Sequence, residues 1–196
     1  ASSAPEPPFL NGVGTGAGWA GPWQVQNFGP GYSGGFRIAD DAPLQFGSLA
    51  ATTSHAIGGH FYETASRALA VESAFAGLEV TGRAPAVIGR DGRSLWFSAL
   101  MRKDTAQFGN DGPFVNFVDD GYAWNFGAAR LAIGYFGGAS ISGGIPCWTL
   151  AVPNAAGTDF DYISSGVPVV AGQAVLLVAR LQFGAADRVD FFVNPT

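Results

Sequence analysis

The segment AVLLVARLQFGAADRVDFFV, residues 174–193, is the part of the sequence that decides the fold class. Residues 174–181 are apolar on both faces of an extended chain, which is typical of a strand in the middle of a sheet. After a turn at Gly184, apolar residues alternate with charged ones, and this alternation places the apolar side chains on one face. The apolar face of this second strand consists of Val189, Phe191 and Val193.

Similar patterns recur along most of the chain. Residues 94–101, SLWFSALM, are the other stretch that is apolar on both faces, and we expect a second central strand there. Short runs bounded by Gly-Gly and Asp-Gly turns predict the remaining strands. The predicted strands are 35–39, 44–49, 59–63, 67–72, 94–102, 113–118, 122–127, 130–136, 145–152, 174–183 and 187–193. About eleven strands without a long helix predict an all-β fold of two packed sheets or a barrel.

Composition favours one globular domain. The chain has 196 residues, of which 47% are apolar and only 13% charged, and these values exclude intrinsic disorder and a coiled coil. The 29 glycines and 12 prolines are spaced too closely for long helices, although residues 68–78 have room for one short helical turn. Residues 1–10 begin with a Pro-rich run that predicts an extended arm, and residues 11–196 then form a single domain.

Charge and hydropathy exclude two classes of partner. The net charge is −5 and the ten basic residues are scattered, so the chain lacks the clustered cationic face that nucleic-acid binding needs. The longest apolar run, 174–179, is too short to insert into a membrane. Cys147 is the only cysteine and is predicted to be a buried apolar residue. Ala1 to Ala4 would fit the new end that signal-peptide cleavage leaves, and an arbitrary edge of the sequence is the alternative. We expect the protein to be secreted or on the cell surface.

Six stretches in order along residues 18–195 have packing and turn patterns of a known kind. They are Gly18–Trp23, Arg67–Leu69, Ser94–Leu100, Ala132–Gly134, Leu176–Gly184 and Asp187–Pro195. Together they resemble the laminin-G-like branch of the concanavalin A-like lectin/glucanase superfamily, and especially its modules in bacterial secreted and surface proteins. The resemblance implies an antiparallel two-sheet jelly-roll sandwich with one curved sheet, export from the cell, and often a place within a longer polypeptide.

The catalytic pattern of the glucanases in this superfamily is missing. Those enzymes carry Glu-x-Asp-x-Glu on one strand, which directs three carboxylates at the sugar. The glutamates of this chain are never within five residues of one another, and they are Glu6, Glu63, Glu72 and Glu79. We therefore expect a protein that is not an enzyme. Asp159 and Asp161 would share a face if extended, but their surroundings predict a loop. His55 and His60 would point to opposite faces of a strand and make a poor metal pair.

Calcium is the one cofactor that the sequence leaves open, because related lectins hold Ca²⁺ at a loop rim with Asp and Asn oxygens. The candidate ligands are Asn110 and Asp111 before one predicted strand, and Asp119 and Asp120 after it. A strand of about six residues would separate the two loops by roughly 20 Å, so they cannot share an ion. Ordinary turn acids are the alternative interpretation.

Glycan binding is a second hypothesis. Tyr122 and Trp124 share one face of a predicted strand, with Asn125 opposite and Asp119 and Asp120 adjacent. An aromatic face surrounded by hydrogen-bonding groups is typical of a sugar site. The same aromatic residues would also serve as a stripe in the core.

Self-association is a third hypothesis. Low charge and a mean hydropathy of +0.19 leave few charged residues to protect exposed strand edges. The arm is suited to lying along a neighbouring molecule, and its residues for this role are Pro5, Pro7, Pro8, Phe9 and Leu10. A monomer with an undocked arm is the alternative.

The combined expectation is a non-catalytic extracellular structural or adhesive module that acts on copies of itself or on other surface proteins and assembles into a layer or filament. A carbohydrate-binding module with glycans as partners comes second. A glycan-cleaving enzyme comes third.

Overall fold

The computed structural model describes residues 10–14, 16–27, 36–39, 44–50, 55–57, 63–82, 86–105, 112–118 and 129–196. Within these ranges the chain forms strands β1 to β14, and its helices are confined to three segments of three or four residues. The helices are α1 (Val71–Ala74), η1 (Ala76–Leu78) and η2 (Gly137–Ser140). The predicted all-β fold class and the short helical turn between residues 68 and 78 are both confirmed.

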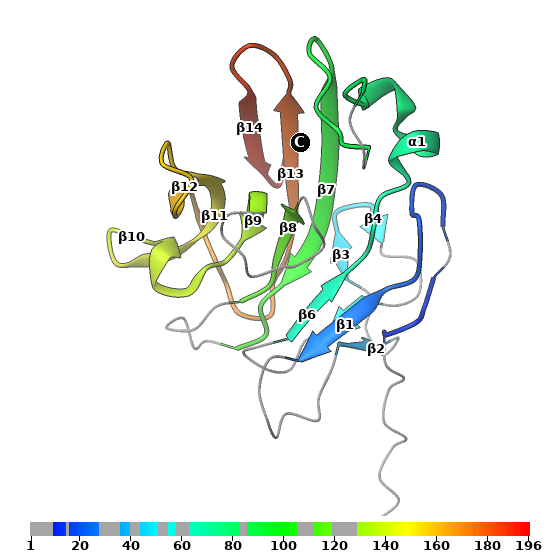
Figure 1. Ribbon diagram of the computed structural model, residues 1–196. Coiled ribbons are helices and arrows are strands. Elements are labelled where there is room, and N and C mark those ends of the chain that lie inside the picture. Colours follow the sequence, from blue (N-terminus) through cyan, green and yellow to red (C-terminus); the bar gives the residue numbers. More distant parts are fainter. Residues whose placement is uncertain are drawn as a thin grey trace, which may run out of the picture.

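Residues 174–193, which decide the fold class, lie in one sheet (Figure 1). It has the strand order β14–β13–β7, with both pairs antiparallel. Its strands are β7 (Ser94–Arg102), β13 (Ala174–Gln182) and β14 (Arg188–Val193). As predicted, β13 is a central strand. In the described part of the chain β7 pairs with β13 alone, so the central position expected for residues 94–101 is not seen there.

A second antiparallel sheet contains five strands. Strand β11 pairs with β12 and with β9, β9 pairs with β8, and the short β10 adds to the first residues of β11. The strands are β8 (Phe114–Val118), β9 (Ala129–Gly134), β10 (Ile141–Ser142), β11 (Ile145–Pro153) and β12 (Phe160–Pro168).

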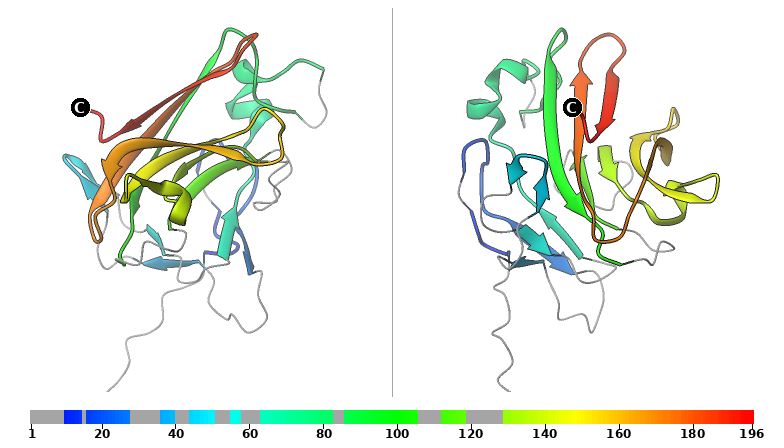
Figure 2. Two further views of the ribbon diagram at one scale, coloured as in Figure 1. Left: turned by 90° about the vertical axis from the view of Figure 1, so that its left-hand side faces the viewer. Right: turned by 180° about the vertical axis from the view of Figure 1, so that it is seen from behind.

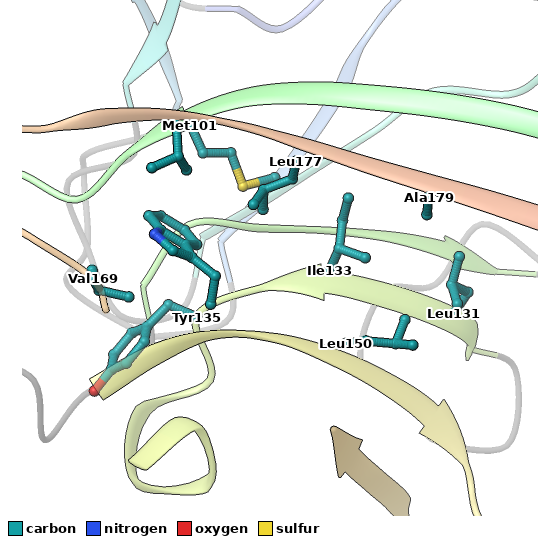
Figure 3. Packing of buried hydrophobic residues seen from close by; sticks show 10 residues of the cluster. Met101, Leu131, Ile133, Tyr135, Leu150, Val169, Leu177 and Ala179 are labelled. Atoms are coloured by element: carbon teal, nitrogen blue, oxygen red, sulfur yellow. The ribbon is translucent and has the colours of Figure 1, made fainter. Parts of the chain in front are cut away.

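The hydrophobic core lies between these two sheets, which face each other as two layers (Figure 2, left). Because successive side chains of a strand point to opposite faces, every second residue reaches the core. Figure 3 shows side chains from β7 and β13 directed toward side chains from β9 and β11. The buried cluster comprises Met101, Leu131, Ile133, Tyr135, Trp148, Leu150, Val169, Val175, Leu177 and Ala179. Each large apolar side chain in it contributes about 1.5–3 kcal/mol by burial, so this cluster is the main source of stability in the described part of the chain.

Three two-stranded sheets complete the described structure. They pair β1 (Gln24–Asn27) with β6 (Glu63–Ser66), β2 (Arg37–Ala39) with β5 (His55–Ile57), and β3 (Gln45–Phe46) with β4 (Leu49–Ala50). Each is antiparallel, so every sheet pairing in the described part of the chain is of this kind.

Two of the stretches that carry the family resemblance meet next to β6. Trp19 and Leu69 form an isolated antiparallel bridge, and the Ala20 amide donates a 2.9 Å hydrogen bond to the Ala68 carbonyl. The Arg67 guanidinium lies 5.0 Å from the centre of the Trp19 ring, and its Nε donates to the Gly21 carbonyl. The backbone contacts and the Arg67 side chain together hold residues 18–23 against residues 67–70, which follow β6.

The structure corrects several sequence-based expectations. The strand predicted at 67–72 is wrong, because only Leu69 forms a bridge and residues 71–74 are helical. The loop predicted around Asp159 and Asp161 is wrong for Asp161 and Tyr162, which belong to strand β12. The sequence does not predict the rest of β12, because Ser-Ser-Gly and a terminal proline are typical of a loop. The predicted strand 122–127, its turn at 119–121 and most of the predicted strand 59–63 lie outside the described residues.

Candidate functional site

Most site residues that the sequence suggested lie outside the described residues. This holds for the calcium candidates Asn110, Asp111, Asp119 and Asp120, for the glycan candidates Tyr122, Trp124 and Asn125, and for Pro5, Pro7, Pro8 and Phe9 of the arm. Leu10 is described. It is only 7% exposed, and its amide donates a 2.8 Å hydrogen bond to the Phe36 carbonyl. Leu10 is thus packed into this chain's own fold.

The exposed aromatic residues Trp96 and Phe192 form the most distinctive surface feature of the described structure. Trp96 on β7 is 55% exposed and Phe192 on β14 is 40% exposed. Their ring centroids are 6.3 Å apart and the ring planes are inclined by only 14°. Exposing two large aromatic groups side by side loses the burial that each would gain in a core, so the arrangement indicates a surface that contacts something else.

The strand register explains how residues from separate strands come together. Trp96 is the cross-strand partner of Arg180 on β13, and Arg180 is in turn the partner of Asp190 on β14. These side chains point away from the core, whereas their neighbours Phe97 and Ala179 point into it. Because the inward residues are packed, the outward residues are held on a rigid base. We call Trp96, Arg180 and Phe192 the Trp96 platform.

Arg180 has an unusual environment. Its guanidinium carbon lies 5.2 Å from the centre of the Trp96 ring, a distance at which a cation is attracted to the ring face. Among the described residues it has no hydrogen-bond or ion-pair partner, and of its three side-chain nitrogens only Nε is closed off from solvent. The cation is therefore held beside an exposed indole with its terminal nitrogens still available.

A bonded polar network borders the platform and explains why Arg180 has no counterion. Asp190 lies next to Arg180 in the sheet, but its Oδ2 accepts a 2.9 Å hydrogen bond from Gln182 Nε2. Its Oδ1 accepts from Arg188, at 2.9 Å from Nε and 2.8 Å from a terminal nitrogen. Both carboxylate oxygens are thus occupied by other donors.

The rest of this outer face is mixed. Its apolar residues Leu100, Leu176 and Val178 are half-buried, and Leu176 pairs with Leu100 across the β7–β13 pair. The other outward positions are mostly polar, and they are Ser94, Ser98, Arg102, Gln182, Arg188 and Asp190. The platform is therefore an aromatic and cationic area on a sheet face of mixed polarity.

The described residues also bear on metal ligands, the single cysteine and membrane-spanning helices. Within the described residues no three His, Cys, Asp or Glu side chains lie together as a metal site would require. His55 lies in β5, and His60 is outside the described ranges. Cys147 is buried, as predicted. In the same part of the chain no helix is long and apolar enough to cross a membrane.

Comparison with known proteins yields no relative: no family model, curated protein or solved structure matches this chain. The interpretation of its surface therefore depends on its own residues.

The alternation of residues 94–98 is a sequence signal for the exposure of Trp96. Residues 94–101 were read as apolar on both faces, yet Trp96 alternates in phase with Ser94 and Ser98, whereas the opposite phase holds Leu95 and Phe97. A tryptophan in phase with serines belongs to the more polar, outward face. Its approach to Phe192 required the strand order, which the sequence did not provide.

Proposed function

We propose that this chain is a non-catalytic, extracellular adhesive module that binds carbohydrate through the Trp96 platform, on a jelly-roll sandwich of the concanavalin A-like type. The single observation that carries the proposal is the exposed, nearly parallel Trp96–Phe192 pair beside polar groups that are already fixed in place. The extracellular location follows from the family resemblance, which implies export.

The chemistry of the platform suits a sugar. A pyranose ring presents C–H groups on its faces and hydroxyl groups at its edge, so it stacks on an aromatic side chain and hydrogen bonds to groups around that side chain. Trp96 and Phe192 offer the apolar surface, and Arg180 offers free donors next to it. Such a site fixes one sugar unit and does not enclose it, as expected of a module that attaches to long glycans.

The fold and the sequence support an adhesive rather than a hydrolytic role. Two antiparallel sheets around one core, and the pairing of residues 18–23 with residues 67–70, agree with a jelly-roll sandwich. The alternating carboxylates of the related glucanases are absent from the sequence. Calcium binding at Asn110, Asp111, Asp119 or Asp120 remains part of the proposal only as a structural aid at a loop rim.

A glycan array tests this function. The fluorescently labelled chain and its Trp96→Ala variant are applied to the same array, with Trp19→Ala as a matched control because Trp19 is an exposed tryptophan outside the platform. We expect Trp96→Ala to lose at least about thirtyfold in affinity, as truncation of a central aromatic contact does. Circular dichroism checks that both variants remain folded. Glycan binding that survives Trp96→Ala, or no glycan binding at all, would refute the proposal.

Self-association is the second candidate, and strand β12 favours it. In the described part of the chain this nine-residue strand pairs only with β11, and Ile163 on it is 51% exposed. A long edge strand with exposed apolar residues is a template for pairing with a second copy. Light scattering of the wild-type chain and of Ile163→Lys at the same concentration tests this: oligomers present only in the wild type would support it, and a wild-type monomer at high concentration would exclude it.

A further inference from the structure

The unpaired cation of the platform points to the kind of sugar that binds. We infer that Arg180 recognises a carboxylate, and that the ligand of the Trp96 platform is a uronic-acid glycan whose ring stacks on Trp96 and Phe192. This inference rests on the proposed carbohydrate-binding function and adds the chemical class of the ligand.

Arg180 forms no ion pair among the described residues, although an aspartate is its cross-strand neighbour. Asp190 is its neighbour across the β13–β14 pair, yet Gln182 and Arg188 occupy both oxygens of that carboxylate. Asp190 is the nearest cross-strand acid to Arg180, but in the described structure its hydrogen bonds go to Gln182 and Arg188. The network thus holds Asp190 in other bonds and leaves the Arg180 charge available.

Without a ligand, the Arg180 guanidinium has lost part of its hydration. Its side chain is partly buried, and its Nε is shielded from solvent without a hydrogen-bond acceptor among the described residues. The Trp96 ring compensates for part of this lost hydration. A carboxylate at the terminal nitrogens would compensate for more, because charge-assisted bonds to a planar guanidinium are among the strongest in proteins.

The aromatic rings of Trp96 and Phe192 and the positive charge of Arg180 occur at the same place. A neutral glycan would use the rings but leave the cation without a partner, whereas an anion without an apolar face would not use the rings. A uronate has both groups in one residue, since its carboxylate is attached at the edge of the pyranose. The chain as a whole carries a net charge of −5, so non-specific attraction of polyanions is disfavoured and recognition must come from this local contact.

The test compares acidic glycans with neutral glycans of the same shape. Oligomers of galacturonate, glucuronate and mannuronate are titrated by calorimetry, each beside its carboxyl-reduced, neutral counterpart. We expect the wild-type chain to bind at least one acid about tenfold or more tightly than its neutral counterpart, which corresponds to one charge-assisted contact. Arg180→Gln should abolish this preference and retain the weaker, Trp96-dependent binding of the neutral oligomer. Arg180→Lys should restore only part of it.

A matched control separates the specific contact from a general change in charge. Arg102 lies on the same outer face of the sheet, but its Nε is already paired with Asp104, so Arg102→Gln should keep the preference for the acid. Thermal melting establishes that the variants are folded. A preference for the acid that persists in Arg180→Gln would overturn the inference. The inference would also be overturned if acidic and neutral oligomers bound equally well and both depended on Trp96. That second result would leave the proposed carbohydrate-binding function intact. If no oligomer of either kind binds, the uronate inference falls, and the glycan array decides the proposed function separately.

Discussion

Gly134 is the residue at which one added methyl group should do most damage to the fold. It is the last residue of β9 and lies between Phe114 on β8 and Thr149 on β11. Its φ of +151° is a conformation that side-chain-bearing residues rarely adopt. An added Cβ would also lie 2.5 Å from Phe114 Cα and would collide with the Pro113 carbonyl oxygen. Both obstacles involve backbone, which cannot move aside without opening the sheet.

The expected loss of stability is the sum of a conformational cost and a cost of steric overlap. The backbone conformation costs about 1–3 kcal/mol for a residue other than glycine, and forced overlap in a packed region adds about 1–3 kcal/mol. Gly134→Ala should therefore lower the free energy of unfolding by about 2–6 kcal/mol, and for a domain of this size the melting temperature by about 4–24 °C. Urea unfolding followed by circular dichroism measures the first quantity, and a thermal scan measures the second.

Substitutions at two other glycines separate the conformational cost from the cost of steric overlap. Gly144 has a φ of +81° but open space around its Cα, so Gly144→Ala should show only the conformational cost, about 1–2 kcal/mol. Gly138 has neither a positive φ nor a close neighbour, so Gly138→Ala should be neutral or stabilise the chain by about 0.4–1 kcal/mol. If Gly134→Ala were no more damaging than Gly144→Ala, the close approach of β8 and β9 would be disproved.

Substitutions at three further positions test the core and the residue that follows β14, each by urea unfolding. Leu177→Ala should cost about 2–5 kcal/mol because Leu177 is fully buried between the sheets, and a loss below 1 kcal/mol would contradict that packing. Trp148→Phe should cost less, about 1–2 kcal/mol, because it also removes an indole N–H that has no partner among the described residues; a loss above 4 kcal/mol would show that this group is bonded. Asn194 has a φ of +53°, and its Oδ1 accepts a hydrogen bond from the Leu176 amide. Asn194→Ala should therefore lower the free energy of unfolding by about 1–2 kcal/mol, and Asn194→Gly should lower it less because glycine tolerates this φ. The reverse order would count against backbone strain at this position.

The strands that the sequence predicted well are those with strong apolar content. Residues 94–102 are observed as β7, and the predicted 174–183 and 187–193 are β13 and β14 with at most one residue of difference at an end. In these strands the alternation of side chains reflects direct contact with the core, so a local pattern contains the relevant information.

The strands that were missed owe their structure to neighbours. Strand β12 contains Ser-Ser-Gly and ends in proline, but it is extended because β11 supplies its hydrogen bonds. Strand β6, ETAS, is polar and short, and it is held by pairing with β1. Tertiary hydrogen bonding of this kind leaves little trace in the local sequence.

The Trp96 platform was not among the sites that the sequence predicted. The glycan site predicted at Tyr122 and Trp124 lies outside the described residues and stays a prediction. The observed platform joins residues 96, 180 and 192, and the first of these is 84 positions from the next. Which of the many aromatic residues meet on one surface is decided by strand order and register, and neither can be read from one strand at a time.

Strands β7, β13 and β14 carry two independent sets of residues, one facing the core and the other facing outward and including the Trp96 platform. A point substitution can alter the outward set without touching the buried set. The insertion or deletion of a single residue, by contrast, would exchange the two sets beyond that point and turn Trp96 or Arg180 toward the interior. In descendants of this chain these three strands should therefore diverge by substitution at alternate positions, and changes of length should be confined to the turns between them.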